Sequence, residues 1–518
     1  MNATTIAGAT AALLYAALGG CSFVLDSSSK QCSVDADCSG PNHPVCQENV
    51  CVESGLGPDG CFFGQPAQQA DFLNQCTTSN FFTFKNCDRL GLCNASQQLP
   101  KPTDAMTGTA PAPQPPAEPL NLCTAGAPTS GTGATPNMIW MTGSSDFGPL
   151  MHAAQPLLSA AATPYRAVFQ NASSCAGVAA AFTGTVMKDP DPAKGNWAFY
   201  YDDGGNPVNC RIDAKGATVV GVPITLAISD LYATTCSTTT PPVTYTPSNT
   251  TVRDYTGPVV PFVFATKAAS SEQSISAEAA HLVFGNGGNP QMLNGMKAVA
   301  PWTDYTQYYI RSNTAGSTVL TAKLIGLDKD KPFWGIDRAS TDNLKDSLLA
   351  ATNPDAALGI LSIDFYDQNR GDLKALYLQS MGQTAGYLPD SKPTTVDKIN
   401  VRDGHYGLWG YVHFIVPTDP AAGNTDINAA AKAIVLRLSA SNLEQSLIDA
   451  IIKASEVPQC AMKVERSDEV GAFSTRNLFS CGCYFDVKTT GHTSCKTCGT
   501  SEDCADGGSC NYGYCEAH

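Results

Sequence analysis

The stretch Met138-Ile-Trp-Met-Thr-Gly-Ser-Ser-Asp-Phe-Gly-Pro149 is the strongest indicator of the fold. It opens with a short apolar run at 138–141, continues as a Gly/Ser loop and leads into a helical pattern at 150–161. A strand, such a loop and a helix in this order form an anion-binding geometry, because the loop amides and the helix N-terminus point at one spot. A single loop of this kind is weak evidence for a fold, so the prediction of the fold class depends on whether the same pattern occurs again.

The same order of signals recurs along the chain. Further apolar runs lie at 165–169, 219–228 and 259–264. A Ser-rich loop at 171–177 follows the first of them, and Ser229-Asp230 ends the second. Helices are predicted at 277–284 after Ser276 as N-cap, from Thr341 or Asp342 to 352 before Pro354, at 426–438 and at 443–454. Strands that alternate with helices predict a parallel sheet and the α/β class.

Length and composition exclude several classes of protein. A chain of 518 residues suggests two to four domains. Its formal net charge of -15, from 46 acidic and 31 basic residues, argues against a nucleic-acid partner, since duplex binding needs a basic surface. No 18-residue apolar run occurs beyond the N-terminus, which argues against a polytopic membrane protein. The 21 cysteines indicate an oxidising compartment.

The N-terminus predicts a bacterial lipoprotein. Residues 6–18 are apolar or small, too short a run to span a bilayer, and Leu18-Gly-Gly-Cys21 resembles a lipobox. Cys21 is then the predicted lipidation site, and Ser22 after it favours the outer membrane. The alternative is an ordinary signal peptide with Cys21 in a disulfide. The first basic residue is Lys30, so the usual positive segment is missing.

The other twenty cysteines divide into blocks with even numbers of residues, as local disulfide pairing would produce. Eight lie between Cys32 and Cys93, and three blocks of four follow: Cys123, Cys175, Cys210 and Cys236; Cys460, Cys481, Cys483 and Cys495; Cys498, Cys504, Cys510 and Cys515. The spacings from Cys32 to Cys51 resemble those from Cys498 to Cys515, which predicts two small disulfide-stapled modules. Zinc is the competing interpretation, because Cys495 and Cys498 form a CxxC near His492.

A linker is predicted at 94–136. Five prolines between Pro111 and Pro119 lie among Ala, Gln and Glu, which favours a semi-extended, poorly packed tether. The predicted organisation is therefore a signal peptide at 1–21, a Cys-rich region at 32–93, this linker, an α/β domain at 137–456 and a Cys-rich region at 457–518.

Seven motifs in the α/β region share their order with a known family. They are Gly143-Ser-Ser145 with Pro149, Ser173-Ser174, Ile228-Ser-Asp230, the apolar strand 259–264, Phe284-Gly285 with Trp302-Thr-Asp304, Arg311 to Thr318, and the segment 354–361. In this order they resemble the type 2 periplasmic binding proteins, specifically the phosphate-binding proteins of ABC importers. The resemblance covers about three-fifths of the chain.

This resemblance implies two α/β lobes joined by crossing strands, with the ligand in the cleft and hinge closure in place of catalysis. Asp230 would accept a hydrogen from a protonated oxyanion, and Arg311 would form a charge-assisted pair with it. Taken singly, each serine is better explained as a helix cap, and the alternative for Arg311 is a surface salt bridge. The implied hydrogen-bond donors are Ser144, Ser145, Ser173 and Ser174 in lobe one, and Ser317 and Thr318 at a helix start in lobe two.

The sequence departs from the family pattern at three places. The family's Ser-Gly-Thr is altered to Gly316-Ser-Thr318, and the first loop carries Asp146 and Phe147. An acidic group such as Asp146 would repel an anion if it pointed inward. An insertion at 234–251 contains Cys236, which favours a pinned segment over a mobile one.

Two other classes of function stay open. A scaffold or adhesion lipoprotein would have a cleft blocked by bulky residues such as Phe147, and a secreted hydrolase would have a nucleophile–base pair in the cleft. No Gly-x-Ser-x-Gly or His-Glu-x-x-His motif occurs, so no enzyme activity, cofactor or metal is predicted. The expected partners are a small oxyanion such as phosphate and, for uptake, an ABC permease, at the bacterial cell envelope.

Overall fold

The structure is a computed structural model, and the chain divides into two compact units, Met1–Gln65 and Pro66–His518, each described here by itself. Cys21 and the predicted lipobox lie outside the described residues. The described residues are 32–33, 37, 45–47, 50–52, 61–93, 97–109, 120–129, 135–188, 197–213, 220–239, 242–243, 245, 251–289, 296–423, 425–439, 443–476, 480–504 and 508–516.

A twelve-stranded sheet runs through the second unit, and two long antiparallel strands form its centre: β14 (Val252–Lys267) and β22 (Trp409–Pro417). We call the strands beyond β22 lobe one: β11 (Leu226–Ser229), β5 (Met138–Gly143), β6 (Arg166–Asn171), β8 (Ala198–Tyr201) and β9 (Pro207–Cys210). We call those beyond β14 lobe two: β18 (Leu358–Ser362), β16 (Tyr308–Ile310), β17 (Gly335–Asp337) and β4 (Thr107–Thr109), with β19 (Leu373–Ala375) also on β14.

The two crossing strands connect the lobes. The first part of β14 pairs with β22 from Val252 to Thr256, and its last part pairs with β18 from Phe262 to Ala265. The register shifts between Thr256 and Val259, as at a β-bulge, which bends a strand and increases its twist. Strand β14 therefore pairs with lobe two through β18, and β22 pairs with lobe one through β11, so the two strands together connect the lobes.

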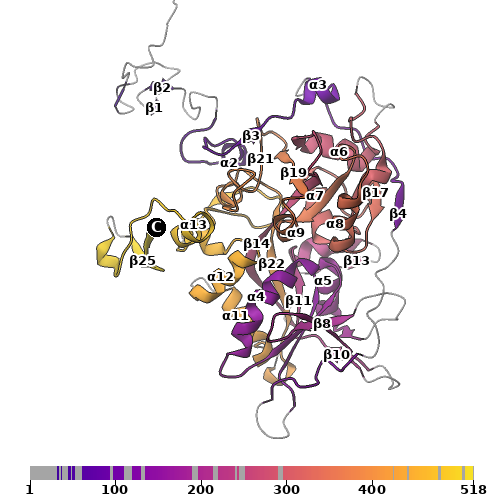
Figure 1. The fold of residues 1–518 in the computed structure, drawn as a ribbon, viewed down its shortest axis with the longest axis vertical. Helices are drawn as coiled ribbons and strands as arrows, with labels where there is room; N and C mark the ends of the chain where they lie inside the picture. Colours follow the sequence, from indigo (N-terminus) through magenta and orange to yellow (C-terminus); the bar gives the residue numbers. More distant parts are fainter. Residues whose placement is uncertain are drawn as a thin grey trace, which may run out of the picture. The chain divides into compact units, whose positions relative to one another are not determined.

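Helices cover the sheet in each lobe (Figure 1). Lobe one carries α4 (Gly148–Ser159), α5 (Ser174–Thr183), α11 (Ala429–Leu438) and α12 (Gln445–Lys453). Lobe two carries α6 (Ala277–Asn286), α7 (Gly316–Leu324), α8 (Thr341–Ala350), α9 (Ile363–Gln368) and α10 (Ile399–Arg402). A buried apolar core lies under them, and among the described residues no helix is long and apolar enough to cross a bilayer.

Smaller elements complete the second unit. A four-stranded sheet is built from β15 (Ser274–Ser276), β20 (Tyr377–Gln379), β21 (Gly386–Tyr387) and β3 (Phe81–Phe82). Three strand pairs are β7 (Val186–Met187) with β10 (Val222–Pro223), β12 (Thr238–Thr239) with β13 (Pro242–Val243), and β23 (Val464–Glu465) with β24 (Ser474–Thr475). The remaining helices are α2 (Gln69–Leu73), α3 (Asn86–Leu90) and α13 (Gly482–Thr490).

The α/β class is confirmed, with differences in detail. The strands β11, β5 and β6 are parallel, and so are β18, β16, β17 and β4, whereas the two crossing strands, β8 and β9 are antiparallel. Helix α8 is capped by Ser340, whose side chain accepts a hydrogen bond from the amide of Asn343, so Thr341 and Asp342 are not its cap. Strand β4 lies within the predicted linker 94–136 and pairs with β17.

Eight disulfides each join two cysteines of one predicted block. They are Cys32–Cys46, Cys87–Cys93, Cys123–Cys210, Cys175–Cys236, Cys460–Cys481, Cys483–Cys495, Cys498–Cys510 and Cys504–Cys515. The thiols of Cys495 and Cys498 are both used, so the zinc interpretation of that CxxC is wrong.

The two small modules have the same local structure. In one, β1 (Val45–Gln47) and β2 (Val50–Val52) form a hairpin that sets Cys46 opposite Cys51. In the other, β25 (Ser509–Asn511) and β26 (Tyr514–Glu516) set Cys510 opposite Cys515. The first cysteine is bonded to the third in both modules, which supports the repeat seen in the sequence.

Candidate functional site

Three neighbouring parallel strands of lobe one end at the same edge of the sheet, and each is followed by a polar loop. Ser144 follows β5, Ser173 and Ser174 follow β6, and Asp230 follows β11. Ligands of open α/β sheets bind at the carboxyl ends of the strands, where the loops converge. The sequence therefore builds the lobe-one half of the site from three local strand–loop units.

Asp230 is the centre of this half-site. Its carboxyl is fully buried, and its Oδ2 accepts hydrogen bonds from the Ser144 hydroxyl at 2.5 Å and the Ser174 hydroxyl at 2.9 Å. Its Oδ1 has no hydrogen-bond partner among the described residues. Gly143 makes this approach possible: its φ is +133°, and a Cβ there would lie 1.9 Å from the Ile228 carbonyl oxygen.

Lobe two brings a helix start and an arginine to the same place. A Cβ on Gly316, the first residue of α7, would lie 2.4 Å from Asp230 Oδ2 and 2.8 Å from Ser174 Oγ. The start of α7 therefore lies against Asp230, and the first amides of a helix favour negative charge. Arg311 follows β16, and its buried Nε has no partner among the described residues.

The remaining contacts of Arg311 position it. Its Nη1 donates to the Thr341 hydroxyl at 2.5 Å, and its carbonyl oxygen accepts a hydrogen bond from the Thr318 hydroxyl at 3.1 Å. Ser317, next to Thr318 in the first turn of α7, is buried. The guanidinium is thus held by α8, and the strand end that carries it is held by α7.

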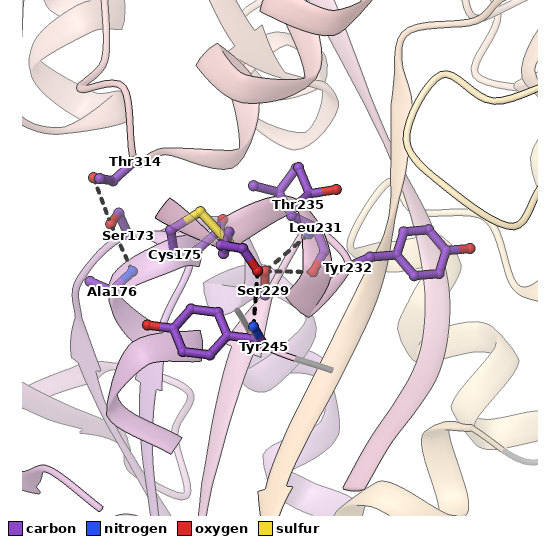
Figure 2. The surroundings of a disulfide bond; sticks show 12 residues. Ser173, Cys175, Ala176, Ser229, Leu231, Tyr232, Thr235, Tyr245 and Thr314 are labelled. Atoms are coloured by element: carbon purple, nitrogen blue, oxygen red, sulfur yellow. Dashed lines mark hydrogen bonds between the residues drawn. A yellow bond between two sulfur atoms is a disulfide. The ribbon is translucent and has the colours of Figure 1, made fainter. Parts of the chain in front are cut away.

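Direct hydrogen bonds join the two lobes around the site. The Ser173 hydroxyl donates to Thr314 Oγ1 at 2.9 Å, and the amide of Cys175 donates to the Thr314 carbonyl at 3.2 Å. Figure 2 shows Ser173 between Thr314 and the amide of Ala176. Elsewhere the Ser362 hydroxyl of lobe two donates to Asp146 Oδ1 at 3.1 Å. The cleft is therefore in a closed conformation.

Three buried carboxyls in this cleft hold their protons more tightly than usual. Burial, and next the negative charge of Asp146, raise the pKa of Asp230 to about 7 against the hydrogen bonds from Ser144 and Ser174. Burial raises the pKa of Asp146 although Arg311 opposes the shift, and burial raises the pKa of Asp364 well above its ordinary value. A protonated carboxyl can donate a hydrogen bond, which an ionised one cannot.

The comparisons with known proteins find structural similarity only. No protein-family model matches the chain, and no curated protein matches it in sequence. It is similar in structure to phosphate-binding proteins. Similar solved structures are a putative phosphate ABC transporter substrate-binding protein with bound phosphate from Clostridium perfringens (11% identity, TM-score 0.37, 62% of this chain and 99% of that one), an ABC-type phosphate transport receptor from Vibrio cholerae (13%, 0.38, 62% and 100%) and a phosphate-binding protein from Stenotrophomonas maltophilia (12%, 0.36, 62% and 90%). At these values the likeness is distant.

The structure brings together most of the predicted site residues: Ser144, Ser174, Asp230, Arg311, Ser317 and Thr318. Ser173 instead caps α5 by accepting from the Ala176 amide and binds Thr314, so its hydroxyl serves the helix and the lobe contact. Ser145 begins the short helix Ser145–Phe147 and lines a cavity beside the site. The sequence could not distinguish these roles, because all four serines start helices or precede them.

Several buried residues of the cleft were not predicted from the sequence, and one, Asp146, was considered only for the case that its side chain points inward. Asp146 points inward, which is the orientation that would repel a fully ionised anion. Ser362 and Asp364 were not predicted, although Ser362 ends β18 and Asp364 lies just after it, at the same strand end as the other polar residues of the site. Glu456 was also missed: both its oxygens are buried without partners among the described residues, and burial raises its pKa well above the ordinary value.

The insertion at 234–251 is tied to this site. Cys236 forms a disulfide with Cys175, the second residue of α5, so the segment is pinned as the sequence favours (Figure 2). Ser237 Oγ also accepts a hydrogen bond from the amide of Tyr245. The disulfide fixes the start of α5, where Ser174 reaches Asp230.

Proposed function

We propose that the protein is a solute-binding protein that captures a small oxyanion, phosphate first, in the cleft between its lobes. The observation that carries the proposal is the convergence on Asp230: two hydroxyls donate to its carboxyl, the start of α7 lies against it, and Arg311 lies in its electrostatic field. Asp230 of lobe one and Arg311 with the start of α7 of lobe two then contact one ligand, so binding favours the closed conformation over an open one.

Each of these groups has a distinct role in the proposal. Arg311 supplies a full positive charge, and the start of α7 supplies amide donors for oxyanion oxygens. Asp230, when ionised, accepts the proton that hydrogen phosphate carries near neutral pH, whereas sulfate carries none and meets repulsion. Asp146 and Asp364 avoid repelling the anion only while protonated, which their raised pKa values favour.

The scaffold alternative required a blocked cleft. Phe147 does not block it, because its ring is fully buried and packs against Phe169 and Phe414 at centroid distances of 6.3 and 5.8 Å. The hydrolase alternative required a nucleophile beside a base. The Ser144 and Ser174 hydroxyls do donate to the Asp230 carboxyl, as a nucleophile donates to its base, so release of the alcohol from a phosphate ester would favour this alternative.

The proposed setting is the bacterial cell envelope, where Cys21 would carry a lipid anchor and an ABC permease would receive the ligand for uptake or sensing. The disulfides of both Cys-rich ends support an oxidising compartment outside the cytosol. Replacement of Cys21 by serine should release the protein from membranes, and mass spectrometry should find an acylated Cys21 as the first residue of the mature chain.

Calorimetric titration of the full chain with phosphate and sulfate tests the binding function. Arg311→Ala should weaken phosphate binding at least about tenfold, since truncating one partner of a buried charged hydrogen bond costs about 2–5 kcal/mol. Lys323→Ala, at an exposed position in the last turn of α7, is the matched control and should have no effect. Asp230→Asn should relax discrimination against sulfate more than it weakens phosphate binding. Failure of the wild-type chain to bind either anion at millimolar concentration would contradict the proposal and favour the scaffold.

A further inference from the structure

A cavity of about 520 Å³ lies between the lobes on the side of the cleft where Ser145 begins its helix. Its lobe-one wall includes Phe199 and Tyr201, and its lobe-two wall includes Asp342, Asp364 and Phe365. Sites for small organic molecules have volumes of about 300–1,000 Å³. The cavity therefore has the size of an organic ligand and is far larger than an inorganic oxyanion needs.

The cavity adjoins the proposed oxyanion site at three points along the chain. Ser145 stands directly after Ser144, whose hydroxyl binds Asp230. Asp342 stands directly after Thr341, which accepts the hydrogen bond from Arg311. Asp364 stands two residues after Ser362, which binds Asp146. A group covalently attached to an oxyanion at Arg311 and Asp230 would extend into this space.

One wall of the cavity is aromatic. The rings of His152 and Tyr201 lie 4.6 Å apart and only 32° from parallel, and Phe199 meets Tyr201 edge-on at 5.8 Å. Phe365 adds a ring from lobe two. Flat aromatic faces pack well against the carbon skeleton of a small organic group.

The other wall offers hydrogen-bond acceptors. Asp364 is only 3% exposed, and its Oδ2 has no hydrogen-bond partner among the described residues although it borders the cavity. A buried polar atom without a partner is costly, so a ligand hydroxyl that reached it would relieve that cost. Asp342 also borders the cavity, at the start of α8, and its exposed carboxylate can accept from a second hydroxyl.

We infer that this cavity holds the hydroxyl-bearing organic part of a phosphate monoester, so that the ligand of the cleft is a phosphorylated polyol or sugar. The inference rests on the proposed function, because the phosphoryl group occupies the oxyanion site. The three phosphoryl oxygens that are not esterified face Arg311, the start of α7 and Asp230, and the ester oxygen leads into the cavity. Because the second pKa of a phosphate monoester is about 6, the shared proton lies on the Asp230 carboxyl, which donates it to a phosphoryl oxygen. The aromatic rings contact the carbon chain, while Asp342 and Asp364 accept hydrogen bonds from its hydroxyls.

Calorimetry of the full chain with inorganic phosphate, glycerol 3-phosphate and glucose 6-phosphate tests this inference. At least one ester should bind as tightly as phosphate or tighter. Asp342→Ala should weaken the binding of that ester about tenfold and leave phosphate binding unchanged or slightly stronger, since it removes a negative charge from the surroundings of Arg311. Asp346→Ala, one turn further along the exposed face of α8, is the matched control and should change neither.

A second variant tests the space itself. Gln368 borders the cavity at the end of α9, and Gln368→Trp should fill part of it and weaken ester binding more than phosphate binding. Phosphate binding without measurable binding of either ester would overturn the inference and leave the proposed function standing. Binding of none of the three compounds would overturn both. Equal losses for ester and phosphate in Asp342→Ala would also overturn the inference.

Discussion

Both lobes contribute residues to the cleft, but they are stabilised by different means. Lobe one contains the disulfides Cys123–Cys210 and Cys175–Cys236. Lobe two has no comparable staple, because no cysteine occurs between Cys236 and Cys460. It holds instead a buried ion cluster in which Lys398 Nζ lies 3.0 Å from Asp367 Oδ2 and 3.0 Å from Asp390 Oδ1.

This difference matches what each lobe contributes to the site. Lobe one presents short loops at strand ends, and Cys175 fixes one of these loops covalently. Lobe two presents Arg311, which follows β16, and the start of α7. A covalent staple restricts the unfolded chain, whereas a buried ion cluster depends on every partner being present. Different substitutions should therefore lower the stability of each lobe.

The largest effect is expected from the ion cluster of lobe two. Lys398→Met leaves Asp367 and Asp390 with Arg370 as their remaining cation in this cluster, at 2.6 and 2.5 Å. Removal of one partner from a buried ion pair costs about 3–5 kcal/mol, because the other charge stays buried. Denaturant unfolding monitored by circular dichroism should show this loss in the free energy of unfolding.

An exposed ion pair supplies the control for that experiment. Lys432 pairs with Asp426 in lobe one, and both side chains are more than one-third exposed, at 39% and 53%. Lys432→Met should therefore cost less than about 1 kcal/mol. If Lys398→Met costs no more than Lys432→Met, the cluster does not stabilise lobe two and the comparison between the lobes is wrong.

The disulfide beside the cleft should have the next largest effect. Replacement of Cys175 and Cys236 by alanine should lower the free energy of unfolding by about 2–4 kcal/mol. It should also weaken phosphate binding, because it frees the start of α5 that carries Ser174. The matched control is replacement of Cys123 and Cys210, which should cost similar stability and leave phosphate affinity unchanged. Unchanged affinity in both double variants would show that the staple does not position the site.

The buried carboxyls of the cleft predict a dependence of stability on pH. Asp230 ionises near its ordinary pKa of 3.8 when unfolded, and its pKa in the fold is about 7. Between these values the folded state holds a proton that the unfolded state has lost, so the free energy of unfolding falls as the pH rises. The slope is about 1.4 kcal/mol per pH unit for one proton.

Substitutions can assign this slope to one lobe or the other. In the unliganded protein Asp230→Asn should reduce the slope of the free energy of unfolding between pH 5 and 7 by the contribution of about one proton. Asp364→Asn should remove the contribution that lobe two makes to the same slope. The measurement is the denaturant midpoint across that range, with the exposed Asp346→Asn as a control that leaves the slope intact. A wild-type midpoint that rises with pH would contradict the burial of these carboxyls as the dominant cause.

The same contrast shows what the sequence could predict. The lobe-one half of the site was predictable because Ser144, Ser174 and Asp230 each follow a local apolar run, and parallel neighbouring strands bring their ends together. The pairing of cysteines within blocks was predictable from the even number of cysteines in each block, although the partners in the central block lie 87 and 61 residues apart.

Features set by distant partners could not be predicted. The crossing of β14 and β22 pairs residues far apart in the chain, and periodicity carries no information about such a partner. The inward orientation of Asp146 depends on Ser362, which lies 216 residues away. The role of Ser173 depends on Thr314 in the other lobe, so its local pattern predicts only a cap.

Ser173 gives the smallest expected effect and the sharpest test of how the lobes meet. Its hydroxyl accepts from the Ala176 amide at the start of α5 and donates to Thr314 Oγ1 across the cleft. Ser173→Ala should cost about 1 kcal/mol of stability as a lost cap, and it should also weaken phosphate binding a few-fold, because a contact specific to the closed conformation is lost. Asn428→Ala removes the cap of α11, at the amide of Ala431, and should cost similar stability without any change in affinity. Calorimetry and denaturant unfolding of both variants separate the two roles: equal affinities would mean that Ser173 is a cap alone and that the lobes close without its help.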